Sequence, residues 1–193
     1  MSLVNFKPKN HPHQVTASGA DDETDDRHTP ARIYDPLHAE HGFTLDVAAA
    51  AHNAKCPRYF DLEADGLAQP WTGEIVWCNP PYSDLGAWTR KALYEVQHGC
   101  PKVVMLLPAN RTEQRWWQET LEPLRDKPGT GVTTRNLPGR PKFGTRDNPH
   151  GIHRETGRGP NGERIRKTSS PFGCVVVVIE ALPRQSDGTK EGG

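Results

Sequence analysis

The sequence predicts an α/β fold in which strands alternate with helices to build a parallel, doubly wound sheet. Short apolar runs of strand length alternate along the chain with stretches of helical periodicity. Polar and proline-containing segments come directly after the strand runs, at the carboxyl ends where α/β sheets bind their ligands. The longest apolar runs, at 103–107 and 174–179, are too short to cross a bilayer, so we expect no membrane association.

The composition indicates one globular domain between polar ends. The chain has 193 residues, 34% of them hydrophobic, and a mean hydropathy of −0.77. Residues 1–28 and 183–193 lack hydrophobic periodicity and are expected to be disordered tails, which leaves a domain at 29–182. Its four cysteines form no Cys-x-x-Cys pair, and there is no signal segment at the start, so we expect reduced thiols in a cytoplasmic protein.

Capping residues and apolar runs set the expected elements. Thr29 is the expected N-cap of a helix with Pro30 in its first turn, and Gly42 ends that helix. Ser83 or Asp84 caps a second helix that runs to about residue 98. A third helix follows the loop at 108–112 and ends near residue 124. Strands are expected at 43–47, near 59–60, and at 74–78, 102–107, 131–137 and 174–180.

The formal net charge is zero, but the charge is unevenly distributed. Residues 140–167 hold eight Arg and Lys against three Asp and Glu. Residues 144–170, which overlap most of this region, form a loop with almost no apolar content, and loops of that length are usually functional or disordered. A basic segment of this kind is typical of a surface that binds a polyanion, although a solvated loop could have the same composition.

The tetrapeptide Asn-Pro-Pro-Tyr at 79–82 is the most informative motif. Its prolines end the preceding strand and hold the backbone extended. The amide oxygen of Asn79 and the carbonyl oxygen of Pro80 could then accept both hydrogens of one planar NH₂ group, while Tyr82 could stack on a ring. Two acceptors favour the pyramidal nitrogen whose lone pair can attack without prior deprotonation. A rigid turn without a chemical role is the alternative. The candidate catalytic residues are Asn79, Pro80, Pro81 and Tyr82.

With this motif the sequence resembles the phage-type DNA N-6-adenine methyltransferases, which are S-adenosylmethionine-dependent amino-methyltransferases. The resemblance also rests on the runs at 43–49, 53–56, 65–67 and 104–109, and it covers about 29–143 and 171–180. It implies a Rossmann-like methyltransferase sheet. It also implies site-specific methyl transfer to N6 of an adenine flipped out of double-stranded DNA. The implied location is the cytoplasm of a bacterial or phage-infected cell.

The resemblance assigns roles to individual residues. It implies that S-adenosylmethionine is bound by Thr29 and Pro30 at its methionine end, by Asp46 and Ala48 in the first cofactor motif, by Asp65 at its adenine amino group, and by Asn79. It implies that Phe143 is a second stacking face for the target base. The basic residues expected to contact DNA phosphates are Arg140, Lys142, Arg164, Arg166 and Lys167.

The sequence departs from this family pattern in three places. Alanines at 48–51 stand where glycines of the first cofactor motif are expected. Only 33 residues separate Asp46 from Asn79, which is too few for three complete strand–helix units, so we expect an abbreviated sheet. The basic loop at 144–170 interrupts the usual run from Lys-Phe to Pro-Phe and is expected to be an insertion.

Other functions stay open at this point. Cytosine-N4 methyltransferases also act on an exocyclic arylamine, and protein-glutamine methyltransferases also use Asn-Pro-Pro-Tyr. A catalytically inactive DNA-binding module would explain the alanines at 48–51, and cofactor binding would exclude it. Methylation at C5 of cytosine needs a cysteine after a proline, whereas both Cys-Pro pairs here have the reverse order. No metal site is expected, because the paired histidines at 11–13 and 150–153 lack partners at a metal-like spacing.

Overall fold

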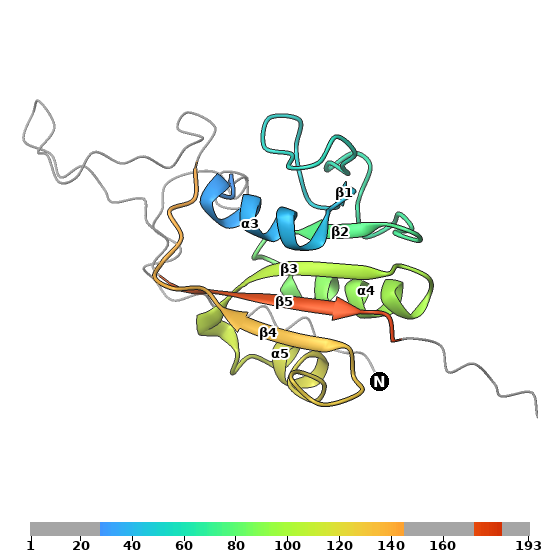
Figure 1. Cartoon of the computed structure of the whole chain (residues 1–193), viewed down its shortest axis with the longest axis vertical. Coiled ribbons are helices and arrows are strands. Elements are labelled where there is room, and N and C mark those ends of the chain that lie inside the picture. Colours follow the sequence, from blue (N-terminus) through green and yellow to red (C-terminus); the bar gives the residue numbers. More distant parts are fainter. Residues whose placement is uncertain (1–27, 145–171, 183–193) are drawn as a thin grey trace, which may run out of the picture.

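A five-stranded mixed sheet with helices on both faces forms the centre of the molecule (Figure 1). The computed structural model describes residues 28–144 and 172–182. The predicted tails at 1–27 and 183–193 lie outside the described residues, as does the basic segment from residue 145 to residue 171. In chain order the elements are α3 (Ala31–His41), β1 (Leu45–Asp46), β2 (Ile75–Cys78), α4 (Leu85–Gln97), β3 (Lys102–Pro108), the 3₁₀ turn η1 (Ala109–Arg111), α5 (Arg115–Thr120), β4 (Val132–Asn136) and β5 (Cys174–Glu180).

The strand order is β1-β2-β3-β5-β4. Strands β1, β2 and β3 are parallel, as predicted, but β5 runs antiparallel to both of its neighbours, β3 and β4. The prediction of a wholly parallel sheet is therefore wrong for β5. The reason lies in the connection, because the chain leaves β4 and enters β5 at the same edge of the sheet, where Asn136 pairs with Val175. An apolar run such as 174–180 specifies a buried strand and carries no information about its direction.

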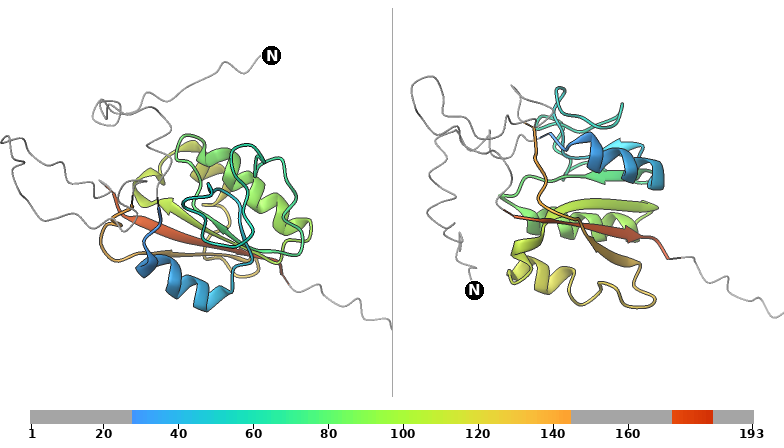
Figure 2. Two further views of the ribbon diagram at one scale, coloured as in Figure 1. Left: turned by 90° about the horizontal axis from the view of Figure 1, so that it is seen from above. Right: turned by 60° about the vertical axis from the view of Figure 1, so that its left-hand side comes forward.

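Side chains of the central strands alternate between two packed faces. Val104 and Leu106 of β3 belong to the cluster that includes α3 residues, whereas Val103, Met105 and Leu107 pack with α4 and α5. Figure 2 (left) shows α3 on one face of the sheet and α4 on the other. No helix in residues 28–144 or 172–182 has the length and apolar character needed to span a membrane.

Two of the three expected helix signals are confirmed. Asp84 caps α4 by accepting a hydrogen bond from the Ala87 N–H at 3.0 Å, and Gly42 ends α3 in the left-handed region with φ of 70°. The expected N-cap at Thr29 is wrong. The N-cap position of α3 is Pro30, which has no side-chain cap, because the Thr29 hydroxyl forms a different hydrogen bond described below. The third helix is shorter than predicted, since α5 ends at Thr120 and turns follow.

The connection from β1 to β2 is abbreviated, as predicted. Strand β1 is shorter than the expected 43–47, although flanking N–H groups of Thr44 and Val47 continue its hydrogen bonding to β2. The strand expected near 59–60 is an isolated parallel bridge between Asp46 and Tyr59. Residues 47–74, all of them described, contain turns and bends and no helix.

Gly66 lets this connection pack tightly against the end of β1. A Cβ atom placed on Gly66 would lie 2.1 Å from the Val47 carbonyl oxygen and 3.1 Å from the Trp88 ring. The Gly66 carbonyl accepts a hydrogen bond at 2.9 Å from the indole N–H of Trp71, whose side chain is buried. The connection from β1 to β2 therefore covers the core with closely packed loop backbone, where a complete strand–helix unit would have a helix.

We predict that Gly66→Ala lowers the free energy of unfolding by about 2 kcal/mol or more, because a backbone oxygen cannot move aside for the added methyl group. Urea denaturation of the two proteins measures the difference. Gly173→Ala is the matched control, since its added Cβ would meet only the Gly139 carbonyl oxygen at 3.7 Å, an ordinary contact. Equal stability of the Gly66 and Gly173 variants would contradict the prediction.

Candidate active site

The carboxyl ends of β1, β2 and β3 bring the predicted polar residues together at one edge of the sheet. Asp46 ends β1, and residues 79–82 follow β2 directly. The start of β5 lies at the same edge, where Cys174 pairs with Pro108. A pocket here is lined by Thr29, Asp46, Ala48, Asn53, Lys55, Trp77 and Asn79. The structure thus places four of the sequence-predicted cofactor residues in one pocket.

Asn79 is held so that its amide oxygen has no partner. Its Nδ2 atom donates to Oγ1 of Thr29 at 3.2 Å. Its Oδ1 atom is buried and accepts no hydrogen bond from any residue in the described part of the chain. Buried polar atoms are nearly always paired, and an exception in a native structure points to a functional role. The site therefore presents a fixed acceptor, which the chemistry inferred from the motif requires.

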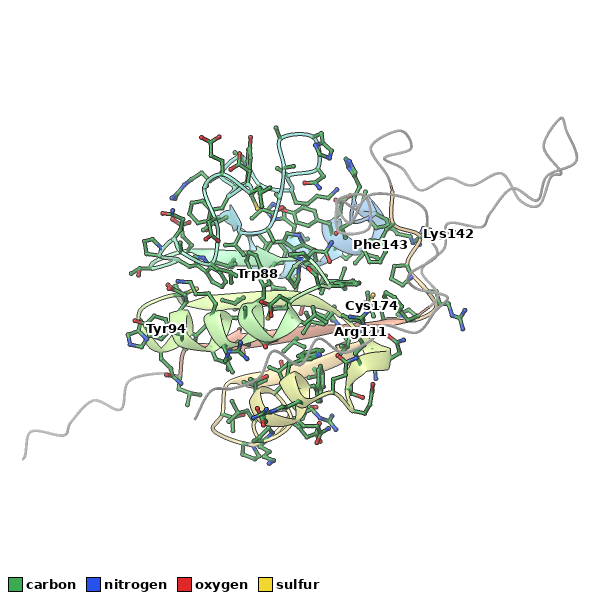
Figure 3. All side chains as sticks on the ribbon, turned by 180° about the vertical axis from the view of Figure 1, so that it is seen from behind. Trp88, Tyr94, Arg111, Lys142, Phe143 and Cys174 are labelled. Carbon is green, nitrogen blue, oxygen red and sulfur yellow. The ribbon has the colours of Figure 1, made fainter. Side chains whose placement is uncertain are left out.

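The rest of the motif is anchored by contacts from two other elements. Arg111 of η1 donates from its guanidinium group to the Tyr82 carbonyl at 3.0 Å. The Tyr82 ring centroid lies 5.7 Å from that of Phe172, and the Tyr82 hydroxyl lies 3.9 Å from Sγ of Cys174. Pro80 is buried, and Pro81 and Tyr82 are partly buried. Figure 3 shows Arg111 and Cys174 at this edge of the molecule.

Asp46 is a buried carboxylate, with 2% of its surface exposed. Its Oδ2 accepts a hydrogen bond from the Lys55 N–H at 3.0 Å, and its Oδ1 accepts one from the Ala48 N–H at 3.3 Å. Burial raises the pKa of Asp46 to about 6, although these two hydrogen bonds act in the opposite direction. At neutral pH the pocket therefore contains a mostly ionised acid whose charge the backbone only partly compensates.

The structure places Asp65 and Pro30 outside this pocket. Asp65 is exposed on the connection from β1 to β2, has φ of 52°, and accepts a hydrogen bond from the Leu67 N–H at 3.1 Å. Pro30 is buried at the start of α3. Neither residue is among those that line the pocket, although Pro30 follows the lining residue Thr29 in the chain.

Phe143 has a structural position that differs from the predicted one. Its side chain is 3% exposed and belongs to the core cluster that contains Phe43 and Trp77. This corrects the expectation of an open stacking face, because Phe143 turns inward while its neighbours Arg140 and Lys142 are exposed. Figure 3 shows Lys142 and Phe143 side by side on their strand-like segment. The remaining predicted DNA contacts, Arg164, Arg166 and Lys167, lie outside the described residues.

Sequence reasoning gave no role to two residues of the site. Arg111 bonds to the motif, and its only sequence signal is a basic side chain just after a strand end at the ligand-binding edge. Lys55 lines the pocket from a loop without regular structure, so periodicity could not place it.

The described residues offer no metal site. No group of three or more His, Cys, Asp or Glu within 28–144 and 172–182 could hold an ion. All four cysteines are free thiols and buried.

Two features together indicate the class of this protein. One is the α/β sheet, and the other is the Asn-Pro-Pro-Tyr motif, which lies beside a polar pocket where the parallel strands end. A model of the family described as DNA N-6-adenine-methyltransferase (Dam) matches residues 17–126. Because that match covers more than half of the sequence, the chain belongs to the DNA N-6-adenine-methyltransferase (Dam) family. The matched range includes the motif and every residue that lines the pocket.

Two phage proteins are also similar to this chain in sequence. The chain is 32% identical over 93 residues to the DNA N-6-adenine-methyltransferase of Escherichia phage T1, an alignment that covers 47% of this chain and 38% of that protein. It is 35% identical over 65 residues to the DNA N-6-adenine-methyltransferase of Haemophilus phage HP1, which covers 34% of this chain and 38% of that protein. The similarity thus spans less than half the length of each of these relatives.

We predict that Asp46 makes the protein less stable as the pH rises from about 4 to about 6. The folded protein binds this proton more tightly than the unfolded chain, so ionisation of Asp46 disfavours the folded state across that window. Asp46→Asn removes the effect, and its free energy of unfolding should gain up to about 3 kcal/mol relative to the unsubstituted protein between these limits.

Urea denaturation at several pH values measures this relative change. Other acids with a lowered pKa, such as the partly buried Glu74, contribute equally in both proteins and cancel in the difference. Parallel stability curves for the two proteins would show that Asp46 does not titrate in this window.

Proposed function

We propose that the chain transfers a methyl group from S-adenosylmethionine to N6 of an adenine in double-stranded DNA. The buried, unpaired Oδ1 of Asn79 carries this proposal, because an exocyclic amine is the group that such an acceptor serves. Membership of the family and the names of the two phage relatives support it. We also propose that the sheet is an abbreviated Rossmann-like methyltransferase sheet in a domain at 29–182, and that it works in the cytoplasm of a bacterial or phage-infected cell.

The residues present suit S-adenosylmethionine as the methyl donor. The pocket combines a buried acid at Asp46, the polar side chains of Thr29 and Asn79, and the small side chain of Ala48. S-adenosylmethionine supplies an electrophilic methyl group attached to a positively charged sulfur. In this proposal Thr29 and Pro30 bind its methionine end, and Asp65 accepts a hydrogen bond from its adenine amino group. Asp46 and Ala48 act as the first cofactor motif, and Asn79 also contacts the donor.

The motif residues act on the target amine. Oδ1 of Asn79 and the carbonyl oxygen of Pro80 accept the two N6 hydrogens and favour the pyramidal nitrogen that can attack. Thr29 holds the Asn79 amide in the required orientation through Nδ2. Arg111 donates a hydrogen bond to the Tyr82 carbonyl and so limits movement of the two prolines that lie between Asn79 and Tyr82. Tyr82 supplies a stacking face. Transfer is direct, without a covalent intermediate on the protein, and the amine loses its proton after attack.

The target adenine has to leave the duplex, which costs a few kcal/mol. Basic side chains that neutralise phosphates can offset this cost and position the duplex. Arg140 and Lys142 are exposed beside the domain, and Arg164, Arg166 and Lys167 follow in the basic segment. We propose these five residues as phosphate contacts.

Identification of the methylated base tests the function directly. The protein is incubated with labelled S-adenosylmethionine and unmethylated duplex DNA, the DNA is digested to nucleosides, and the labelled nucleoside is identified by mass spectrometry. We expect the labelled nucleoside to be N6-methyldeoxyadenosine. Detection of N4-methylcytosine would instead identify the exocyclic amine of cytosine as the substrate. Label found on the protein alone, or no labelled product at all, would overturn the proposal.

We predict that Asn79→Ala abolishes methyl transfer and leaves affinity for S-adenosylhomocysteine, the product of the methyl donor, within about fivefold. The physical reason is that Oδ1 serves the target amine. Transfer is measured with labelled donor, and affinity by calorimetry. Asn136→Ala on the exposed end of β4 is the matched control and should keep full activity. An equal loss of transfer and cofactor affinity would assign Asn79 to the cofactor instead.

We predict that replacing Arg164, Arg166 and Lys167 together with Gln weakens DNA binding and flattens its salt dependence by up to about three units of slope, because each phosphate contact releases about one counterion. DNA affinity is measured over a series of salt concentrations. The matched control replaces Arg115, Arg125 and Lys127, on and after α5, and should leave the slope unchanged. The same slope in both triple variants would mean that the basic segment is a solvated loop.

A further inference from the structure

The pocket contains two side chains of opposite charge. Among the described residues that line it, Asp46 is the acid and Lys55 is the base, and the others are uncharged. A ligand group that carries both a cation and an anion is the electrostatic complement of such a pair. The α-amino-acid group, with its ammonium and carboxylate, is a group of this kind.

The backbone of Lys55 is fixed from two sides. Its N–H donates to Oδ2 of Asp46 at 3.0 Å, and its carbonyl accepts a hydrogen bond from the Tyr34 hydroxyl at 2.9 Å. The same hydroxyl lies 3.4 Å from Sγ of Cys56. Tyr34 is a buried residue of α3, whereas Asp46 ends β1. A helix and a strand thus hold Lys55 in place although its own loop has no regular structure.

The ammonium group of Lys55 forms no ion pair with a carboxylate in the described part of the chain, although Asp35 and Asp46 lie near enough to interact with it electrostatically. Its Nζ lies 5.8 Å from the centroid of the Tyr34 ring, a weak cation–π contact. Lys55 is partly buried, and burial lowers the pKa of its amine. A cation that is partly removed from water and forms no ion pair gains from binding an anionic group.

We propose that Lys55 binds the α-carboxylate at the amino-acid end of the methyl donor, opposite the buried Asp46 carboxylate. The proposal rests on the function proposed above and deepens it by naming the residue that recognises a donor with a free carboxylate.

Two ligands separate the proposed contact from other effects. S-adenosylhomocysteine carries the α-carboxylate, whereas 5′-methylthioadenosine has the same adenosine and thioether without the amino-acid group. Binding of both to the full chain is measured by calorimetry. The proteins are the unsubstituted chain, Lys55→Met, which keeps the apolar stem, Lys55→Arg, which keeps the charge, and Lys127→Met, a control that removes one exposed lysine.

We expect Lys55→Met to bind S-adenosylhomocysteine about tenfold or more weakly, the effect of one lost charge-assisted hydrogen bond. Its affinity for 5′-methylthioadenosine should stay within about twofold. Lys55→Arg should recover most of the affinity for S-adenosylhomocysteine, and Lys127→Met should not differ from the unsubstituted chain. Because the comparison is between two ligands in one protein, a general loss of structure would affect both and could not imitate this pattern.

Three results would overturn the assignment of Lys55. Unchanged affinity of Lys55→Met for S-adenosylhomocysteine excludes the contact, while the unsubstituted chain still binds both ligands and the proposed function stands. An equal loss for both ligands assigns Lys55 a structural role. Loss of DNA affinity alone makes Lys55 a phosphate contact. If the unsubstituted chain binds neither ligand, the methyl donor itself is wrong and the function proposed above fails together with this inference.

Discussion

The hydrogen bond from Asn79 to Thr29 determines which end of the Asn79 amide is left without a partner among the described residues. It joins residues 50 positions apart and connects the segment before α3 to the end of β2. With Nδ2 occupied by the hydroxyl, the amide cannot rotate without losing that bond, and Oδ1 remains buried and unpaired among the described residues. An unpaired buried acceptor lowers stability. In the proposed function, the hydrogens of the target amine would supply the partners that Oδ1 lacks.

The antiparallel direction of β5 completes the site. A parallel strand would begin at the opposite edge of the sheet, whereas β5 begins at the edge where β2 and β3 end. Its first residue, Cys174, and the preceding Phe172 therefore reach the Tyr82 side chain. The reversal thus supports the motif, and it leaves the exposed Arg140 and Lys142 on the segment that runs toward the basic loop.

Local signals in the sequence predicted what depends on local structure. The Asp84 cap, the Gly42 terminus, the strand at 174–180 and the position of residues 79–82 after a strand all follow from short-range chemistry. The errors involve contacts between distant segments. Thr29 has the composition of an N-cap, but its hydroxyl bonds to Asn79 instead. Phe143 follows two basic residues in the sequence, but its ring is buried in the core on the α3 face of the sheet. No local pattern distinguishes these outcomes.

The alanines at 48–51 can be explained by the hydrogen bonds that the backbone after β1 forms. Glycine is needed in such a loop where backbone N–H groups approach a ligand closely. Here the N–H groups of Ala48 and Lys55 bond to the carboxylate of Asp46 instead, so the backbone is turned toward the protein's own acid. Recognition at this end of the pocket consequently falls to side chains, and close backbone approach is unnecessary. An alanine methyl group is then tolerated, so the alanines at 48–51 do not argue against the proposed cofactor site.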